Sequence, residues 1–107
     1  MIIELKKFGD LLISRPAGRE AFLALSAYVI RDIDSAEPIE IDFSGVKVLT
    51  PSWADEVITK LAERFPNIRF SNTANASVQA TLETLREYSG VSYSNGTTLA
   101  TGKVVAG

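Results

Sequence analysis

Residues 39–61 read IEIDFSGVKVLTPSWADEVITKL, and this stretch decides the fold. Its first part alternates apolar Ile39, Ile41 and Phe43 with polar Glu40 and Asp42, which is the pattern of a half-buried strand. Its second part predicts a helix, because apolar residues recur at helical spacing along one face, namely Ala54, Val57, Ile58, Leu61, Ala62 and Phe65. A strand therefore leads directly into an amphipathic helix.

Small polar side chains gather where the strand leads into the helix: Asp42, Ser44, Thr50 and Ser52. Capping accounts for part of this set. If Thr50 is the N-cap, Pro51 takes the first helical position, where its missing N–H does no harm. If Ser52 is the cap, Asp55 falls three residues later, as in a capping box. Turn formation or capping and a working surface both remain open interpretations of these residues.

The remaining segments complete an alternation of strands and helices. Short strands are expected at residues 2–6 and 11–14, and Gly9-Asp10 between them predicts a hairpin. Helical spacing follows at 16–33. It returns at Val78, Leu82 and Leu85, and Gly90 ends that helix. A strand is expected at 68–70, whereas 46–49 is interpreted as a structured connection. This order predicts an α/β fold with a mixed, mostly parallel sheet of about four strands, covered by three or more helices.

Parallel strands place the loops that follow them along one edge of a sheet. Here those loops are residues 42–50 and 71–75. The sequence therefore predicts that Asp42, Ser44, Thr50, Ser52, Asn72 and Asn75 gather near one rim.

Composition narrows the functional classes. The 107 residues include neither cysteine nor histidine, which excludes Cys-His and Ser-His-Asp catalysis and zinc sites with nitrogen or sulfur ligands. The net charge of −2 and the scattered basic residues give no case for nucleic-acid binding. No apolar run is long enough to span a membrane, so we expect a cytoplasmic protein. We also expect no cofactor. We expect one domain over 1–89 and a C-terminal extension over 90–107, either flexible or a short hairpin at Asn95-Gly96.

Two apolar features allow alternative interpretations. The first helix is apolar on more than one side, since Leu23, Ala27 and Ile30 extend its stripe. It either packs deeply against the sheet or offers one flank to another molecule, which includes a second copy in a homodimer. Trp53 either completes the edge of the core or stands exposed as an anchor for a partner.

The stretch 39–61 resembles the STAS-like family, which is related to bacterial anti-sigma factor antagonists. The matching residues are Asp42, Phe43, Gly45, Val46, Ser52, Trp53, Ala54, Asp55 and Glu56, and KFGDLLISRPAG at 7–18 is similar to the family's opening. The resemblance implies a small regulatory protein whose partner is a serine kinase, or anti-sigma factor, with a histidine-kinase-like ATP fold. It places Pro51 at the position of the phosphorylated serine of the antagonists, and only Thr50 and Ser52 beside it carry hydroxyls.

We therefore predict a non-enzymatic interaction module that docks a protein partner through residues 42–56. The predicted contact residues are Asp42, Ser44, Gly45, Thr50, Ser52, Trp53, Asp55 and Glu56. Asp55 and Glu56 already place negative charge at the helix start, which argues against an ordinary phosphorylation switch at Ser52. The alternative is a small metal- or nucleotide-dependent enzyme that uses the carboxylates of the same rim.

Overall fold

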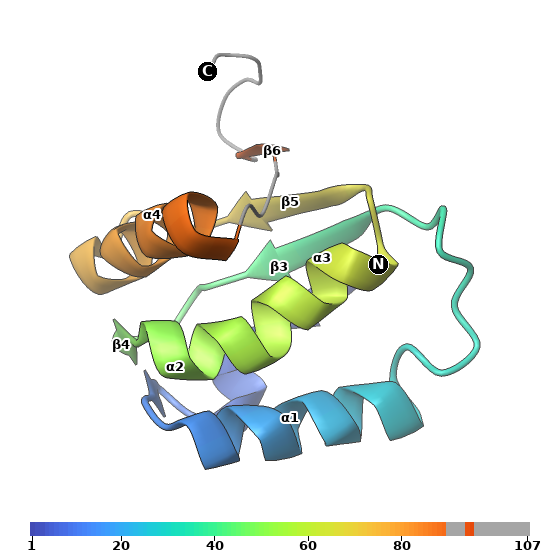
Figure 1. The fold of residues 1–107 in the computed structure, drawn as a ribbon, viewed down its shortest axis with the longest axis horizontal. Helices are drawn as coiled ribbons and strands as arrows, with labels where there is room; N and C mark the ends of the chain where they lie inside the picture. Colours follow the sequence, from blue (N-terminus) through green and yellow to red (C-terminus); the bar gives the residue numbers. More distant parts are fainter. Residues whose placement is uncertain (90–93, 96–107) are drawn as a thin grey trace.

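The structure, a computed structural model, describes residues 1–89 and 94–95 (Figure 1). Its main sheet has the order β1-β3-β5-β6, formed by β1 (Ile2–Glu4), β3 (Ile39–Asp42), β5 (Ile68–Ser71) and β6 (Ser94–Asn95). A second sheet pairs β2 (Leu11–Leu12) with β4 (Val48–Leu49). All pairings between these strands are parallel. The α/β fold with a largely parallel sheet is thus as predicted.

Helices connect the strands. α1 (Arg15–Tyr28) joins β2 to β3, and α4 (Ala76–Ser89) follows β5. Between them, α2 (Pro51–Ala54), the π-helical turn η2 (Asp55–Thr59) and α3 (Lys60–Arg64) run on as one helix, hereafter helix 51–64. In Figure 1 this helix lies between α1 and α4. It is therefore covered from two sides, and more of its residues are buried than in α1: Trp53, Ala54, Glu56, Val57, Ile58 and Leu61.

The predicted hairpin at the amino terminus is wrong. The one-turn 3₁₀ helix η1 (Leu5–Phe8) separates β1 from β2, and Leu5 on this turn is fully buried. β1 pairs with β3, whereas β2 pairs with β4. Residues 46–49, expected only as a connection, provide β4. β1 and β2 are only three and two residues long, so pairing with each other would contribute little stability. Burial of Leu5 between them is satisfied when the two strands join different sheets.

One face of the main sheet is apolar and the other is polar. Ile39, Ile41, Ile68 and Phe70 point into the core, while Glu40 and Arg69 on the opposite face form an ion pair with an N–O distance of 3.1 Å. The buried apolar residues form one cluster, in which the rings of Phe43 and Phe70 meet edge to face at 5.5 Å. The helices therefore close the core from one side of the sheet.

Two expectations concern the chain ends and the membrane. Ser94 and Asn95 pair with Arg69 and Phe70 of β5, whereas the rest of the predicted extension, including the proposed turn at Asn95-Gly96, falls outside the described residues. The division into 1–89 and 90–107 stays a prediction. Within the described residues, no helix combines the length and the apolar character needed to cross a membrane.

Candidate docking surface at the strand ends

The two polar loops that follow β3 and β5 meet, as the topology predicted. One carboxylate oxygen of Asp42, Oδ1, accepts hydrogen bonds from the Ser44 amide at 2.8 Å and from the Asn72 side chain at 2.7 Å. The Asn75 side chain donates to the Lys47 carbonyl at 3.0 Å. We call residues 42–50 and 71–75, together with the start of helix 51–64, the strand-end rim. Hydrogen bonds between the two loops therefore hold the rim in one arrangement.

The first turns of α4 hold β4 in place. The Ser77 hydroxyl accepts a hydrogen bond from the Leu49 amide at 2.8 Å and donates one to the Leu49 carbonyl at 3.0 Å. The buried hydroxyl of Thr81 donates to the same carbonyl at 2.6 Å. β4 is therefore fixed on one side by α4 and on the other by its pairing with β2.

Helix 51–64 begins at Thr50, which settles the choice between the two capping schemes. Thr50 is the N-cap residue and Pro51 takes the first helical position. The Thr50 hydroxyl does not cap the helix; it donates to the Leu12 carbonyl at 3.3 Å and so ties the helix start to β2. Ser52 is half-buried at the surface of the first turn. The hydroxyl-bearing residues of the junction thus serve different purposes.

Two predicted contact residues are structural. Trp53 is 1% exposed and its ring lies 6.1 Å from that of Phe8, so it completes the core and the anchor interpretation is wrong. Gly45 adopts a φ of 84°, and a Cβ there would lie 3.0 Å from Cδ of Lys6. A glycine is required at this turn because L-residues with side chains are strained at such a φ. Trp53 therefore cannot contact a partner directly, whereas Gly45 is exposed at its turn and stays a predicted contact.

Glu56 was predicted to lie on the docking surface, but its side chain is only 9% exposed. Its Oε1 lies 2.8 Å from Nζ of Lys60, and its Oε2 lies 2.7 Å and 3.7 Å from guanidinium nitrogens of Arg15 and Arg19. The hydrogen bonds from Lys60 and Arg15 lower the pKa of Glu56 to about 2, well below its ordinary value. The bonds to Glu56 and Asp55 in turn raise the pKa of Arg15. This cluster joins α1 to helix 51–64.

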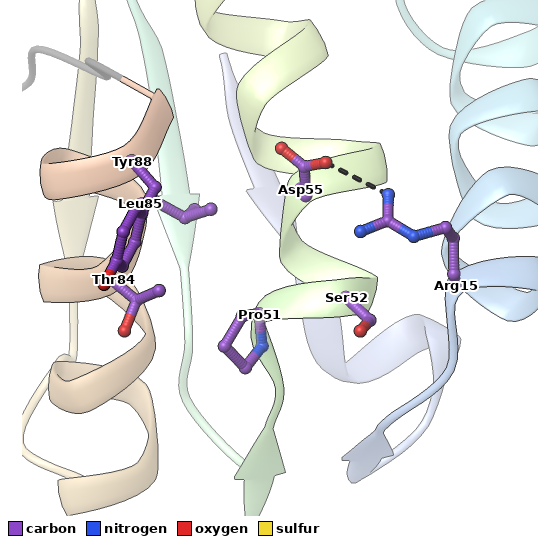
Figure 2. Close-up of a pocket in the computed structure, with 7 residues that line it drawn as sticks. All are labelled: Arg15, Pro51, Ser52, Asp55, Thr84, Leu85 and Tyr88. Atoms are coloured by element: carbon purple, nitrogen blue, oxygen red, sulfur yellow. Dashed lines mark hydrogen bonds and ion pairs between the residues drawn. The ribbon is translucent and has the colours of Figure 1, made fainter.

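Asp55 stays at the surface. Its carboxylate accepts a hydrogen bond from Arg15 at 3.0 Å and remains 38% exposed. Figure 2 shows this bond at the edge of a shallow cleft of about 220 Å³ between the start of helix 51–64 and α4. The cleft is lined by Arg15, Pro51, Ser52, Asp55, Thr84, Leu85 and Tyr88. The residues that line it on α4, among them the largely exposed Tyr88, were not anticipated from the sequence.

An apolar patch beside the rim was also missed. Leu11 and Ile13 are 56% and 55% exposed, and Val48 lies next to Leu11 in the parallel register of β2 and β4. The neighbouring residues Leu12 and Leu49 face the core instead. We call Leu11, Ile13 and Val48 the outer apolar patch. The alternation around Leu12 could have indicated it, had β2 not been assigned to a hairpin.

The carboxylates of the rim do not converge. Asp42 is bonded to Asn72 and to the Ser44 amide, and Asp55 to Arg15. In the part of the chain that the structure describes, no group of three or more acidic, histidine or cysteine side chains is placed to hold a metal ion. Among the described residues, the metal-dependent form of the enzyme alternative therefore has no such cluster of ligands to support it.

A comparison of the chain with known families bears on the fold. A family model described as a STAS-like domain of unknown function matches residues 26–78. The chain carries a STAS-like domain. The match runs from within α1 to the first turn of α4, so it includes both loops of the strand-end rim. The comparisons with curated proteins and with solved structures found no match.

Proposed function

We propose that this STAS-like domain is a non-enzymatic regulatory module that docks a protein partner through the strand-end rim. The observation that carries the proposal is the outer apolar patch, which leaves Leu11, Ile13 and Val48 exposed beside the rim. Contiguous exposed apolar side chains bordered by polar groups are typical of protein interaction sites. The apolar patch would supply the binding energy, and the rim would supply orientation.

The rim supports docking without an ordinary phosphorylation switch. Pro51 stands at the position that the resemblance assigns to the phosphoacceptor, and it has no hydroxyl. Ser52 lines the same cleft as Arg15 and Asp55. A phosphate on Ser52 would share its cleft with the Asp55 carboxylate, while Arg15 already binds Asp55 and Glu56. Arg15, the cation that would stabilise such a phosphate, is therefore already paired with Asp55 and Glu56.

The partner class follows from the family resemblance. We propose a serine kinase with a histidine-kinase-like ATP fold, acting with this domain in the cytoplasm. Candidate kinases of this class from the native host would be titrated against the full chain, with the dissociation constant measured by calorimetry.

The decisive variant is the double substitution Leu11→Lys/Val48→Glu. It places opposite charges on a register pair, which spares the β2–β4 pairing while removing the patch. We expect affinity to fall at least about tenfold, the equivalent of about 1.4 kcal/mol. The matched control is Ile2→Lys, because Ile2 is similarly exposed but lies on β1 of the other sheet. Equal binding by the double variant and the wild type would refute docking at this surface.

The enzyme alternative is tested in parallel. Thermal unfolding of the wild type would be measured with magnesium and with nucleotides. A strong ligand-dependent rise in the melting temperature would favour the alternative over a pure docking module.

A further inference from the structure

The backbone of β2 has an edge that β4 does not use. The Asp10 carbonyl accepts a hydrogen bond from the first amide of β4 at 3.1 Å, and the Leu12 carbonyl accepts one from the amide that follows β4 at 3.0 Å. Because the N–H and C=O of a trans peptide point in opposite directions, the Leu11 and Ile13 amides point away from β4. The Leu11 carbonyl points the same way, since successive backbone groups of a strand alternate between its two edges.

These three backbone groups are open to another molecule. Among the described residues, none forms a hydrogen bond with them. Leu11 and Ile13 are more than half exposed, and Figure 1 shows β2 at the lower left of the molecule. The far edge of β4 is different, because the Ser77 hydroxyl bonds both the amide and the carbonyl of Leu49. The small sheet therefore has one edge closed by α4 and one open edge, residues 11–13, which we call the β2 edge.

The pattern of the β2 edge determines the kind of molecule that fits it. Two donors with an acceptor between them match the acceptor, donor and acceptor of an extended backbone laid alongside. The Leu11 and Ile13 side chains lie on the outer face of β2, whereas Leu12 between them faces the core. An added strand therefore places every second side chain beside the outer apolar patch.

We infer that the protein partner adds an extended segment to the β2 edge, with apolar side chains at alternate positions beside the outer apolar patch. This inference rests on the proposed function, for which it names the mode of recognition. Backbone hydrogen bonds supply affinity in such a contact, and the side chains supply specificity. Since η1 ends at Phe8 and α1 begins at Arg15, only a short segment of the partner can pair.

A proline substitution tests the backbone part of the contact. Ile13→Pro removes one N–H of the β2 edge and leaves the hydrogen bonds to β4, and proline is tolerated in a strand where its N–H would face outward. The matched control is Ile13→Ala, which shortens the same side chain and keeps the N–H. Titrated with the candidate kinases of the proposed function, Ile13→Pro should bind at least about tenfold more weakly than Ile13→Ala. Equal affinities of the two variants would overturn the inference.

Hydrogen exchange followed by NMR measures the same contact without a substitution. In the complex with the kinase, the Leu11 and Ile13 amides should exchange at least about tenfold more slowly than in the chain alone. Unchanged exchange would count against strand addition. So would protection that is already present in the chain alone and is lost when the chain ends at Asn95, because residues 96–107 would then occupy the edge.

Failure of this inference and failure of the proposed function give different results. If Leu11→Lys/Val48→Glu weakens binding but Ile13→Pro behaves like Ile13→Ala, the partner uses the outer apolar patch without adding a strand, and only the inference fails. If no candidate kinase binds the wild type, both fail.

Discussion

Glu56 shows how one side chain can join two helices. Its carboxylate, at the start of helix 51–64, meets Arg15 and Arg19 from α1 and Lys60 from the next turn of its own helix. A nearly buried carboxylate is tolerated only when it is paired and hydrogen-bonded, and here three cations share that task. Replacing one partner therefore removes more than a surface ion pair.

The pH dependence of stability follows from this cluster. Because folding lowers the pKa of Glu56 from 4.5 to about 2, its contribution to the free energy of unfolding is complete above about pH 5 and is lost as pH falls towards 2. Glu56→Gln should be less stable than the wild type at neutral pH. It should also lose less stability than the wild type between pH 6 and pH 2, as measured by urea unfolding at a series of pH values.

Glu63→Gln is the control for the pH experiment. Glu63 is exposed on the same helix, so this variant should follow the pH profile of the wild type. Parallel profiles for Glu56→Gln and the wild type would mean that the Glu56 cluster does not act as described.

At the scale of elements, α1 and helix 51–64 approach each other closely at a glycine. A Cβ on Gly18 would lie 2.7 Å from the Trp53 carbonyl oxygen, 3.0 Å from the Trp53 Cα and 3.1 Å from the Glu56 Cβ. Two of these three atoms belong to the backbone, which cannot move without shifting the helix. The close approach is what brings Arg15 within reach of Asp55 and Glu56.

Gly18→Ala should therefore destabilise the domain, although alanine is the better helix former. We expect a net loss of up to about 2 kcal/mol in the free energy of unfolding, since overpacking costs about 1–3 kcal/mol and helix propensity returns about 1. The matched control is Ala80→Gly on the exposed side of α4, where glycine should be the less stable residue by about 1 kcal/mol. If alanine stabilised both positions, the helices would not be in contact at Gly18.

At the scale of the whole molecule, both sheets and all the long helices contribute to one core. The buried cluster includes Leu12 of β2, Leu25 of α1, Trp53 of helix 51–64, Phe70 of β5 and Leu82 of α4. A single cluster shared by elements far apart in the sequence predicts cooperative unfolding without a separately stable part.

Trp53 reports on this cooperativity because it is the only tryptophan in the chain. Urea unfolding followed by its fluorescence and by far-UV circular dichroism should give the same midpoint, since its burial depends on the same core as the helices. A fluorescence midpoint at lower urea would show that α1 and helix 51–64 separate before the sheet.

Local patterns were sufficient for the strand 39–42, the apolar face of helix 51–64 and the meeting of the two polar loops. They were insufficient at the amino terminus, where two short apolar segments near Gly9 are equally consistent with a hairpin and with separate parallel pairings. They were also insufficient for Trp53 and Glu56, because residues on the border of a helical stripe are buried or exposed according to what packs beside them. Here α1 on one side and α4 on the other covered both borders.

Taken alone, the sequence determined the alternation of β3, helix 51–64, β5 and α4 and the edge at which the polar loops meet, because the periods of apolar residues and the crossover rules are local or topological. The tertiary structure decided which polar residues are surface and which are internal. It buried Glu56 and Trp53, and it left Leu11, Val48, Leu23 and Tyr28 exposed. The physical reason is that burial depends on neighbours brought from distant parts of the chain, and no single segment encodes its neighbours.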